Sequence, residues 1–290
     1  MSESKVEKQL DRRLNAYRPD LADVRLAGQV QADRYVDGET FYVGVPVARV
    51  HMAPDAASGM DTQFLHGEEL RVFDRRSGWA WVQGQRDSYV GYVPESNIVE
   101  GSFSATHIAC VPRTFVYPEP ELKRPALHTH SMGALVNVVD EIEVRGTRYA
   151  ILDGDRAMIL RHLRPLNEVP ADYVSVAEQF IHTPYLWGGA SGMGIDCSGL
   201  VQLSMRMAGK FVQRDTDMQA SSIGLQIDPD STPLRRGDLV FWQGHVAICT
   251  SPDEIIHANG YSMQVSREPL GETIARIDPL YGLPTLYRRP

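Results

Sequence analysis

Short runs of β-branched and aromatic residues, separated by turn formers, fill the chain from about residue 41 to residue 165. The clearest runs cover 42–50, 69–73, 79–82 and 89–93, with turn-forming clusters at 53–55, 77–78 and 94–96. Strands this short and this closely spaced leave no room for helices between them. The pattern therefore predicts small all-β bodies of the barrel or sandwich type in this part of the chain.

The same layout of strands and turns occurs twice. Three matched positions lie 64, 66 and 65 residues apart: Pro54 and Pro118, Gly67 and Gly133, and Gly91 and Arg156. A regular period of this length indicates that one small unit is repeated in tandem. We therefore expect a first β barrel over residues 39–102 and a second, more degenerate barrel over residues 103–166.

The segments on either side of these barrels have a different pattern. Residues 1–38 are charged, with apolar residues at helix-like spacing and a break at Pro19, which predicts a short helical extension. After a proline-containing linker, the sequence predicts helices over 173–181 and 197–208 and strands over 239–242, 245–250 and 255–258. Helices followed by an antiparallel meander indicate an α+β domain over residues 170–290.

The composition of the 290-residue chain excludes several classes of protein. With 43% hydrophobic and 23% charged residues, the chain is typical of a folded globular protein rather than a disordered one. A net charge of −8 argues against a nucleic-acid partner, because binding nucleic acid requires a basic surface. No apolar run has the length of a membrane-spanning helix. The sequence carries no signal for a particular oligomeric state.

The first residues and the cysteines bear on location. Residues 1–8 are charged where a signal peptide needs an apolar core. The three cysteines, Cys110, Cys197 and Cys249, are an odd number at wide spacings, which is no disulfide framework. We therefore expect a cytoplasmic protein in a reducing environment.

Cys197 has the local setting of a reactive thiol. It follows a glycine-rich stretch and Asp196, and it opens the predicted helix over 197–208. A thiol attacks as the thiolate, so its free pKa of about 8.5 must be lowered, and the positive end of a helix favours that ionisation. The same helix start offers backbone N–H groups to a tetrahedral oxyanion. We also expect the glycines to allow the main chain to approach a substrate closely.

Such a cysteine needs a base and a group that orients the base. His245 begins a predicted strand, and His257 lies on the next one. If these strands pair, the two imidazoles are cross-strand or diagonal neighbours. The simplest four-residue turn sets Gly260, rather than His257, opposite His245.

Taken alone, these residues also allow other interpretations. A single cysteine is most often a small buried hydrophobe, which suits Cys110 and Cys249, and a lone strand histidine is most often structural. Zinc binding by Cys197, His245 and His257 is a further alternative, although the usual paired spacing of zinc ligands is missing. We therefore expect no metal and no cofactor.

Five sequence blocks, in a fixed order across about 170–290, make the assignment more specific. They are PYLWGG at 184–189, GIDCSGLV at 194–201, RGDLVF at 236–241, GHVAI at 244–248 and HA at 257–258. Together they resemble the NlpC/P60 superfamily of bacterial cell-wall peptidases, which has a papain-like fold. The first β unit, with WAWV at 79–82 and DSYVGYV at 87–93, resembles a bacterial SH3-like domain.

The resemblance implies a cysteine peptidase with two SH3-like barrels ahead of its catalytic domain. Cys197 would be the nucleophile, His245 the general base and His257 the group that orients the imidazole. Tyr185 would hydrogen-bond near the thiolate or the oxyanion. The implied chemistry is amide hydrolysis through an acyl-enzyme.

The barrel architecture is similar to that of γ-D-glutamyl-L-diamino acid endopeptidases. In this subgroup the first barrel abuts the cleft and limits it to murein peptides with a free N-terminal L-alanine, followed by γ-D-glutamate and meso-diaminopimelate or L-lysine. Such peptides arise in cell-wall recycling. The resemblance places Asp196, Ser198 and Tyr89 around the substrate amine and the glutamyl carboxylate. Thr216, in the run RDTD at 214–217, stands where a serine is common.

The sequence departs from the subgroup at one point. The glutamate that meets the substrate amine aligns with Gly59, and Asp61 lies two residues away as a candidate replacement. Without the resemblance, Asp196 is equally well explained as a plain helix cap and Tyr89 as a barrel aromatic. Two other functions stay open: an amidase or acyltransferase on the same scaffold, and a non-catalytic module that binds cell-wall peptides.

Overall fold

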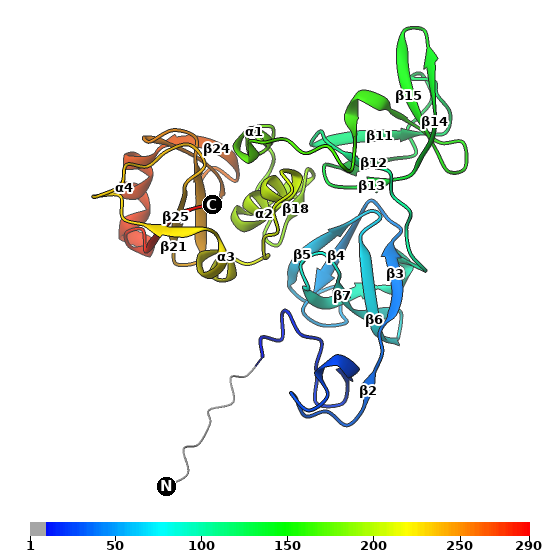
Figure 1. Cartoon of the computed structure of the whole chain (residues 1–290), viewed down its shortest axis with the longest axis horizontal. Helices are drawn as coiled ribbons and strands as arrows, with labels where there is room; N and C mark the ends of the chain where they lie inside the picture. Colours follow the sequence, from blue (N-terminus) through cyan, green and yellow to red (C-terminus); the bar gives the residue numbers. More distant parts are fainter. Residues whose placement is uncertain (1–9) are drawn as a thin grey trace.

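The structure, a computed structural model, describes residues 10–290. Figure 1 shows two β units on one side and an α+β domain on the other, with the N-terminal segment next to the first β unit. Among the described residues no helix is long and apolar enough to span a membrane.

The N-terminal segment, residues 10–38, contains no α-helix. It holds a short parallel pair, β1 (Ala22–Asp23) and β2 (Tyr35–Val36), and a 3-10 turn between them. Ala16 and Leu21 are buried against Phe73 and Trp81 of the first β unit. The expected helical extension is therefore wrong for residues 10–38, because the scattered apolar residues pack onto a sheet instead of forming one helix face. Residues 1–9 of that extension lie outside the described residues.

The first β unit is a seven-stranded antiparallel sheet in the order β5-β4-β8-β7-β6-β3-β9. Alternate residues of its strands face a buried core, as Ala80 and Val82 do, while Trp81 between them faces the N-terminal segment. The expected strands over 69–73, 79–82 and 89–93 are present, and the run 42–50 is divided in two near Pro46. The strands are β3 (Glu39–Val43), β4 (Val47–His51), β5 (Met60–Leu65), β6 (Glu69–Arg76), β7 (Trp79–Gly84), β8 (Val90–Pro94) and β9 (Ile98–Glu100).

The second β unit has its own buried core and repeats the element order of the first, including a single 3-10 turn before the last strand. Its strands form one sheet in the order β12-β11-β16-β15-β14 and another in the order β13-β10-β17. They are β10 (His107–Ala109), β11 (Arg113–Tyr117), β12 (His128–Ser131), β13 (Leu135–Val136), β14 (Val138–Val144), β15 (Thr147–Leu152), β16 (Ala157–Ile159) and β17 (Leu163–Pro165). The chain is thus multidomain, with a β-rich region ahead of the α+β domain. That the second unit is an SH3-like barrel stays a prediction.

Histidines lie at the joint between the two β units. The backbone of His66 accepts a hydrogen bond from the N–H of Leu135 at 2.9 Å, and its Nδ1 lies 2.8 Å from the Leu135 carbonyl oxygen. The His66 ring centroid is 4.5 Å from that of His130, which in turn is 4.9 Å from that of His128. Burial lowers the pKa of all three imidazoles, to about 2 for His130.

The α+β domain is built on a six-stranded sheet in the order β20-β25-β21-β22-β23-β24. Side-chain alternation gives the sheet two apolar faces. One face, with Phe241 and Ile248, packs on α1 and α2, and the other, with Val240 and Ala247, packs on α4. The helices are α1 (Tyr173–Glu178), α2 (Cys197–Met207), α3 (Thr216–Ser222) and α4 (Leu270–Tyr281).

The strands of this domain agree with the expected meander. The structure adds one strand beside β23, two strands beyond β21 and a separate two-stranded pair. The strands are β18 (Ala190–Ser191), β19 (Gly194–Ile195), β20 (Leu225–Ile227), β21 (Leu239–Trp242), β22 (His245–Cys249), β23 (Glu254–Asn259), β24 (Gln264–Pro269) and β25 (Leu286–Arg289). Ile248 pairs with Ile256, and this register, extended along the strands, sets Asn259 opposite His245. The expected pairing with Gly260 is wrong because the turn is one residue longer than the simplest one.

Candidate active site

Cys197 is the first residue of α2, as expected, and is buried with 7% of its surface exposed. Asp196 is the N-cap, and its Oδ1 accepts a hydrogen bond from the backbone N–H of Gly199 at 2.7 Å. The thiol lines a cavity of about 480 Å³. Its nearest polar side chain is Thr216, whose Oγ1 lies 3.9 Å from Sγ.

The ionisation of this thiol differs from the sequence expectation. Burial, followed by the nearby carboxylate of Asp196, raises the pKa of Cys197 to about 11, despite a hydrogen bond from the Val246 backbone that acts in the other direction. The expected lowering of the pKa by the helix end is therefore wrong, because loss of solvent is the dominant effect. Cys197 is a neutral thiol at pH 7, so attack requires a base that removes its proton.

The two histidines of the sheet are in contact, as predicted. His245 Nε2 lies 2.9 Å from His257 Nδ1, and the backbone of the neighbouring Val246 touches the thiol. Burial lowers the pKa of His245 to about 3, so its imidazole is neutral at pH 7. No hydrogen bond joins His245 to Cys197 within residues 10–290, and Nε2 of His245 is engaged by His257.

Glu268, at the far side of this pair, was missed by the sequence analysis. Its Oε1 lies 3.3 Å from His257 Nε2 without forming a hydrogen bond, so we treat the contact as electrostatic. His257, followed by Ser266 and Arg276, holds the pKa of Glu268 well below its usual range. The only sequence signal for this residue is its position on the strand that follows His257.

These contacts fix which ring nitrogen carries each proton. A carboxylate only accepts, so the Glu268 charge favours a proton on Nε2 of His257 and leaves Nδ1 of that ring as an acceptor. His245 must then donate from Nε2 to His257. The free lone pair of His245 is on Nδ1, the nitrogen that remains for a thiol proton.

A buried ion pair fixes the floor of the cavity. Arg214, 1% exposed, donates to both carboxylate oxygens of Asp196, at 3.0 and 2.6 Å, and to Ser198 Oγ at 2.7 Å. Gly188 also donates its backbone N–H to Asp196 Oδ2 at 2.9 Å. Because every Asp196 lone pair has a donor, the structure favours the helix-cap role weighed for this residue over binding of a substrate amine.

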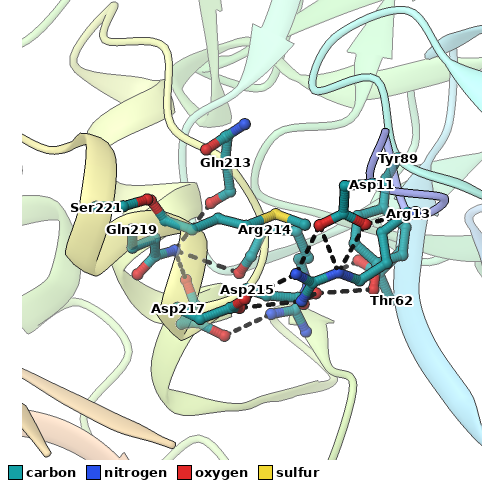
Figure 2. A network of polar contacts seen from close by, with 12 residues as sticks. Asp11, Arg13, Thr62, Tyr89, Gln213, Arg214, Asp215, Asp217, Gln219 and Ser221 are labelled. Atoms are coloured by element: carbon teal, nitrogen blue, oxygen red, sulfur yellow. Dashed lines mark hydrogen bonds and ion pairs between the residues drawn. The ribbon is translucent and has the colours of Figure 1, made fainter. Parts of the chain in front are cut away.

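Three separate parts of the chain form the remaining walls of the cavity. The first β unit contributes Asp61 and Tyr89, the loop before α3 contributes Asp215, and the N-terminal segment contributes Arg13. Tyr89 donates its hydroxyl to Asp215 Oδ2 at 3.1 Å, and Figure 2 shows Arg13 on the other side of that carboxylate. Tyr185 and the exposed Trp187 lie on the same cavity, and burial followed by the Cys197 charge raises the pKa of Tyr185 to about 12.

Asp61 is the uncommitted acid of this cavity. Burial, and then the charge of Asp215, raises its pKa, and no hydrogen bond holds its carboxylate among the described residues. Asp215 is also buried with a raised pKa, but Arg13 and Tyr89 occupy it. Asp61 is therefore placed to receive a cation from outside the chain.

Two of the glycines before Cys197 allow close contact with the β units. A Cβ on Gly188 would lie 2.4 Å from the Met60 carbonyl oxygen, and one on Gly192 would lie 1.9 Å from that of Pro112. These positions let the loop touch the backbones of the first and second β units. Gly188 also lines the cavity, and the expected close approach to substrate stays a prediction.

Side-chain hydrogen bonds also dock the first β unit on the α+β domain. Gln63 accepts from the Ala190 backbone, Asp87 accepts from Gln202 on α2, and Glu68 accepts from Arg206 on α2, each at 2.9 Å. The first β unit is therefore fixed beside the helix that carries Cys197, and Figure 1 shows β5 facing β18 and α2.

Comparison with known proteins agrees with this architecture. The model of the NlpC/P60 family matches residues 182–276, and that of the bacterial dipeptidyl-peptidase Sh3 domain matches residues 50–98. The chain therefore contains an NlpC/P60 domain. It is a cysteine peptidase with a bacterial SH3 domain ahead of its catalytic domain.

Relatives of this NlpC/P60 peptidase cover most of the chain. A γ-D-glutamyl-L-lysine dipeptidyl-peptidase from Bacillus cereus is 26% identical over 74% of this chain and 72% of its own length. Dipeptidyl-peptidase 6 from Lysinibacillus sphaericus is 24% identical over 81% of this chain and 92% of its own. The crystal structure of an NlpC/P60 family protein from Bacillus cereus, 21% identical, superimposes with a TM-score of 0.71 over 86% of this chain and 99% of its own.

The NlpC/P60 peptidase brings most of its predicted site residues to one cavity. This set is Asp61, Tyr89, Tyr185, Asp196, Cys197, Ser198 and Thr216. His245 and His257 do not line this cavity, although Gly244, next to His245 in sequence, does. The sequence analysis missed Arg13 and Glu268 as site residues, because no motif marks either one. Within residues 10–290 no cluster of side chains is suited to hold a metal ion, so the zinc arrangement weighed above has no support.

Proposed function

We propose that this peptidase hydrolyses the γ-D-glutamyl-diamino acid bond of murein peptides that begin with a free L-alanine. The observation that carries the proposal is the uncommitted carboxylate of Asp61, supplied by the first β unit at one end of the cavity that holds Cys197. A half-buried acid without a partner favours a cationic ligand group. The α-ammonium of a free N-terminus supplies that charge, and an acetylated one does not.

The names of the relatives support the same substrate class. The Bacillus cereus relative is a γ-D-glutamyl-L-lysine dipeptidyl-peptidase, and the Lysinibacillus sphaericus relative is named dipeptidyl-peptidase 6. An enzyme that releases a dipeptide must measure two residues from a free amino end. The location of Asp61 and Cys197 on one cavity supports such a measurement.

In the proposed mechanism Cys197 is the nucleophile and His245 the general base. Nδ1 of His245 takes the thiol proton as Sγ attacks the γ-glutamyl carbonyl carbon, and the first N–H groups of α2 face the developing oxyanion. His245 then returns the proton to the leaving amine of the diamino acid, and water hydrolyses the thioester by the reverse sequence. His257 orients the imidazole, and Glu268 orients His257.

The hydroxyl groups around the thiol complete the site. Tyr185 and Thr216 lie next to Cys197 and are placed to hydrogen-bond the oxyanion or the glutamyl carboxylate. Tyr89 lies beside Asp61 at the amine end. Ser198 is held by Arg214, so its part is to shape the cavity floor.

The test is release of L-Ala-D-Glu from L-Ala-γ-D-Glu-L-Lys and from its meso-diaminopimelate counterpart, followed by mass spectrometry. We expect release by the wild type, none by Cys197→Ala and little from the N-acetylated peptides. Equal cleavage of acetylated and free peptides would replace this proposal by a broader amidase. Binding without cleavage by the wild type would replace it by a peptide-binding module. A cytoplasmic location, a role in peptide recycling and an SH3-like second unit stay predictions.

A further inference from the structure

The N-terminal segment reaches the cleft from the first β unit through one side chain. Arg13 donates from NH1 to Asp215 Oδ2 at 2.8 Å and from NH2 to Asp217 Oδ2 at 2.7 Å, and its remaining donors are held by Asp11. Figure 2 shows the guanidinium enclosed by these three carboxylates. Arg13 thus links the N-terminal segment to the loop that begins α3, which lies more than 200 residues away in sequence.

The backbone around Arg13 is fixed on the first β unit. Its carbonyl oxygen accepts from the Val90 N–H at 2.8 Å, and the Leu14 carbonyl accepts from Gln83 at 2.8 Å. Arg18 pairs with Asp74 at 2.7 Å and stacks over Trp81 at 4.4 Å. The guanidinium of Arg13 is therefore presented from a rigid support rather than from a loose chain end.

The segment that Arg13 holds is part of the site. Asp215 is the N-cap residue of α3, and Thr216, the first residue of that helix, lies 3.9 Å from the Cys197 thiol. Within the described residues the side chain of Asp215 makes no capping bond to α3. Its carboxylate is instead shared between Arg13 and Tyr89.

We propose that Arg13 is a positioning residue that holds residues 215–217 against the thiol and keeps Asp215 occupied, so that Asp61 alone receives the ammonium group of the peptide. The second half of this statement rests on the proposed function. Without Arg13, Asp215 would keep only the Tyr89 hydroxyl, and two acids without an ion-pair partner would face one cavity. The N-terminal segment then forms the wall at the amine end of the cleft, together with Asp61 and Tyr89.

The charges around these acids determine the expected pH response. Asp215 faces Arg214, Arg13 and Tyr89, and Asp61 faces Asp215, Arg214, His51 and Arg13. Arg13 acts to lower the pKa of both carboxyl groups. Its removal raises both pKa values, so the acidic limb of the kcat/KM profile moves to higher pH.

The experiment compares Arg13→Ala, Arg13→Lys and Arg12→Ala in the full chain. Arg12 is an exposed neighbour of equal charge whose guanidinium lies over Tyr17, which makes it the matched control. With L-Ala-γ-D-Glu-L-Lys we expect Arg13→Ala to lose about 10- to 100-fold in kcat/KM, the range for charge-assisted hydrogen bonds, with both kcat and KM affected and the acidic limb shifted. In Arg13→Lys we expect the acidic limb of the kcat/KM profile to stay at its wild-type pH and part of kcat to be recovered. Arg12→Ala matches the wild type.

A second readout needs no substrate. Alkylation of Cys197 by iodoacetamide reports the surroundings of the thiol, and we expect its rate and pH dependence to change in Arg13→Ala and not in Arg12→Ala. If the wild type releases no dipeptide but the alkylation difference is present, the proposed function fails and the positioning role holds. If Arg13→Ala equals Arg12→Ala in kinetics, pH profile and alkylation, the positioning role fails, whatever the substrate.

Discussion

Arg214, a buried guanidinium, donates hydrogen bonds to both carboxylate oxygens of Asp196, the residue next to Cys197. Leaving either charge without its partner in this position is costly. We expect Arg214→Ala to lower the free energy of unfolding by about 3–5 kcal/mol, measured by urea denaturation. Arg236→Ala is the control, since its pairs with Asp172 and Glu178 are solvent-exposed and contribute at most about 1 kcal/mol. Equal losses in the two variants would contradict this account.

Glu268 acts on catalysis through two imidazoles. We expect Glu268→Ala to lower kcat/KM by about 10- to 100-fold, as when the partner of a functional imidazole is removed, with a smaller effect on KM. Because the contact with His257 is electrostatic, Glu268→Gln, which lacks the charge, should recover little of the rate. Glu272→Ala, an exposed glutamate on α4, should match the wild type. A normal rate for Glu268→Ala would show that His257 is oriented without it.

The histidines at the joint of the two β units make stability depend on pH. His66, His128 and His130 have folded pKa values below the unfolded value of 6.5, with burial as the main cause, helped at His128 and His130 by Arg156. The unfolded chain therefore binds more protons, so stability is complete above about pH 6.5 and falls as the pH drops below it. We expect the urea midpoint to decrease between pH 7.5 and pH 5.5.

A substitution at His130 isolates the contribution of its buried imidazole to the acid sensitivity of the fold. His130→Phe keeps the aromatic stack and removes the protonation site, so its urea midpoint should fall less on acidification than that of the wild type. His107→Gln, outside this cluster, serves as the control. The same acid sensitivity in both variants would place its origin elsewhere in the chain.

Gly188 tests the contact between the catalytic loop and the first β unit. Its φ is +71°, and an added Cβ would lie 2.4 Å from the Met60 carbonyl. Gly78 has φ +79° with open space around it. Both alanine variants have the same backbone strain. We therefore expect the free energy of unfolding of Gly188→Ala to be lower than that of Gly78→Ala by about 1–3 kcal/mol, the usual cost of overpacking, as measured by chemical denaturation. Similar losses of stability in both variants would mean that the backbone near Met60 moves aside at little cost.

The sequence predicted the parts of this protein that local pattern determines. Strand alternation and turn residues marked β6, β7 and β8, and the cap at Asp196 marked the start of α2. Side-chain alternation also predicted that His245 and His257 would be neighbours if their strands pair, and the two imidazoles are in contact. These features depend on neighbours within a few residues, which a pattern records directly.

What the sequence did not predict depends on contacts between distant segments. The apolar residues of 10–38 resemble a helix face, but their partners are Phe73 and Trp81. The pKa of Cys197 follows from how completely other elements bury it, and not from the helix end alone. Arg13 and Glu268 enter the site through tertiary contacts, so no spacing in the sequence points to them.

The position of β25 has a consequence for the order in which this protein matures. This strand, Leu286–Arg289, lies between β20 and β21, and Thr285 just before it lines the cleft. Domains fold in the order in which the ribosome releases them, so the β units form while the catalytic sheet still lacks an inner strand. The cleft wall that carries Asp61 and Tyr89 therefore forms before the sheet that packs on the Cys197 helix is complete.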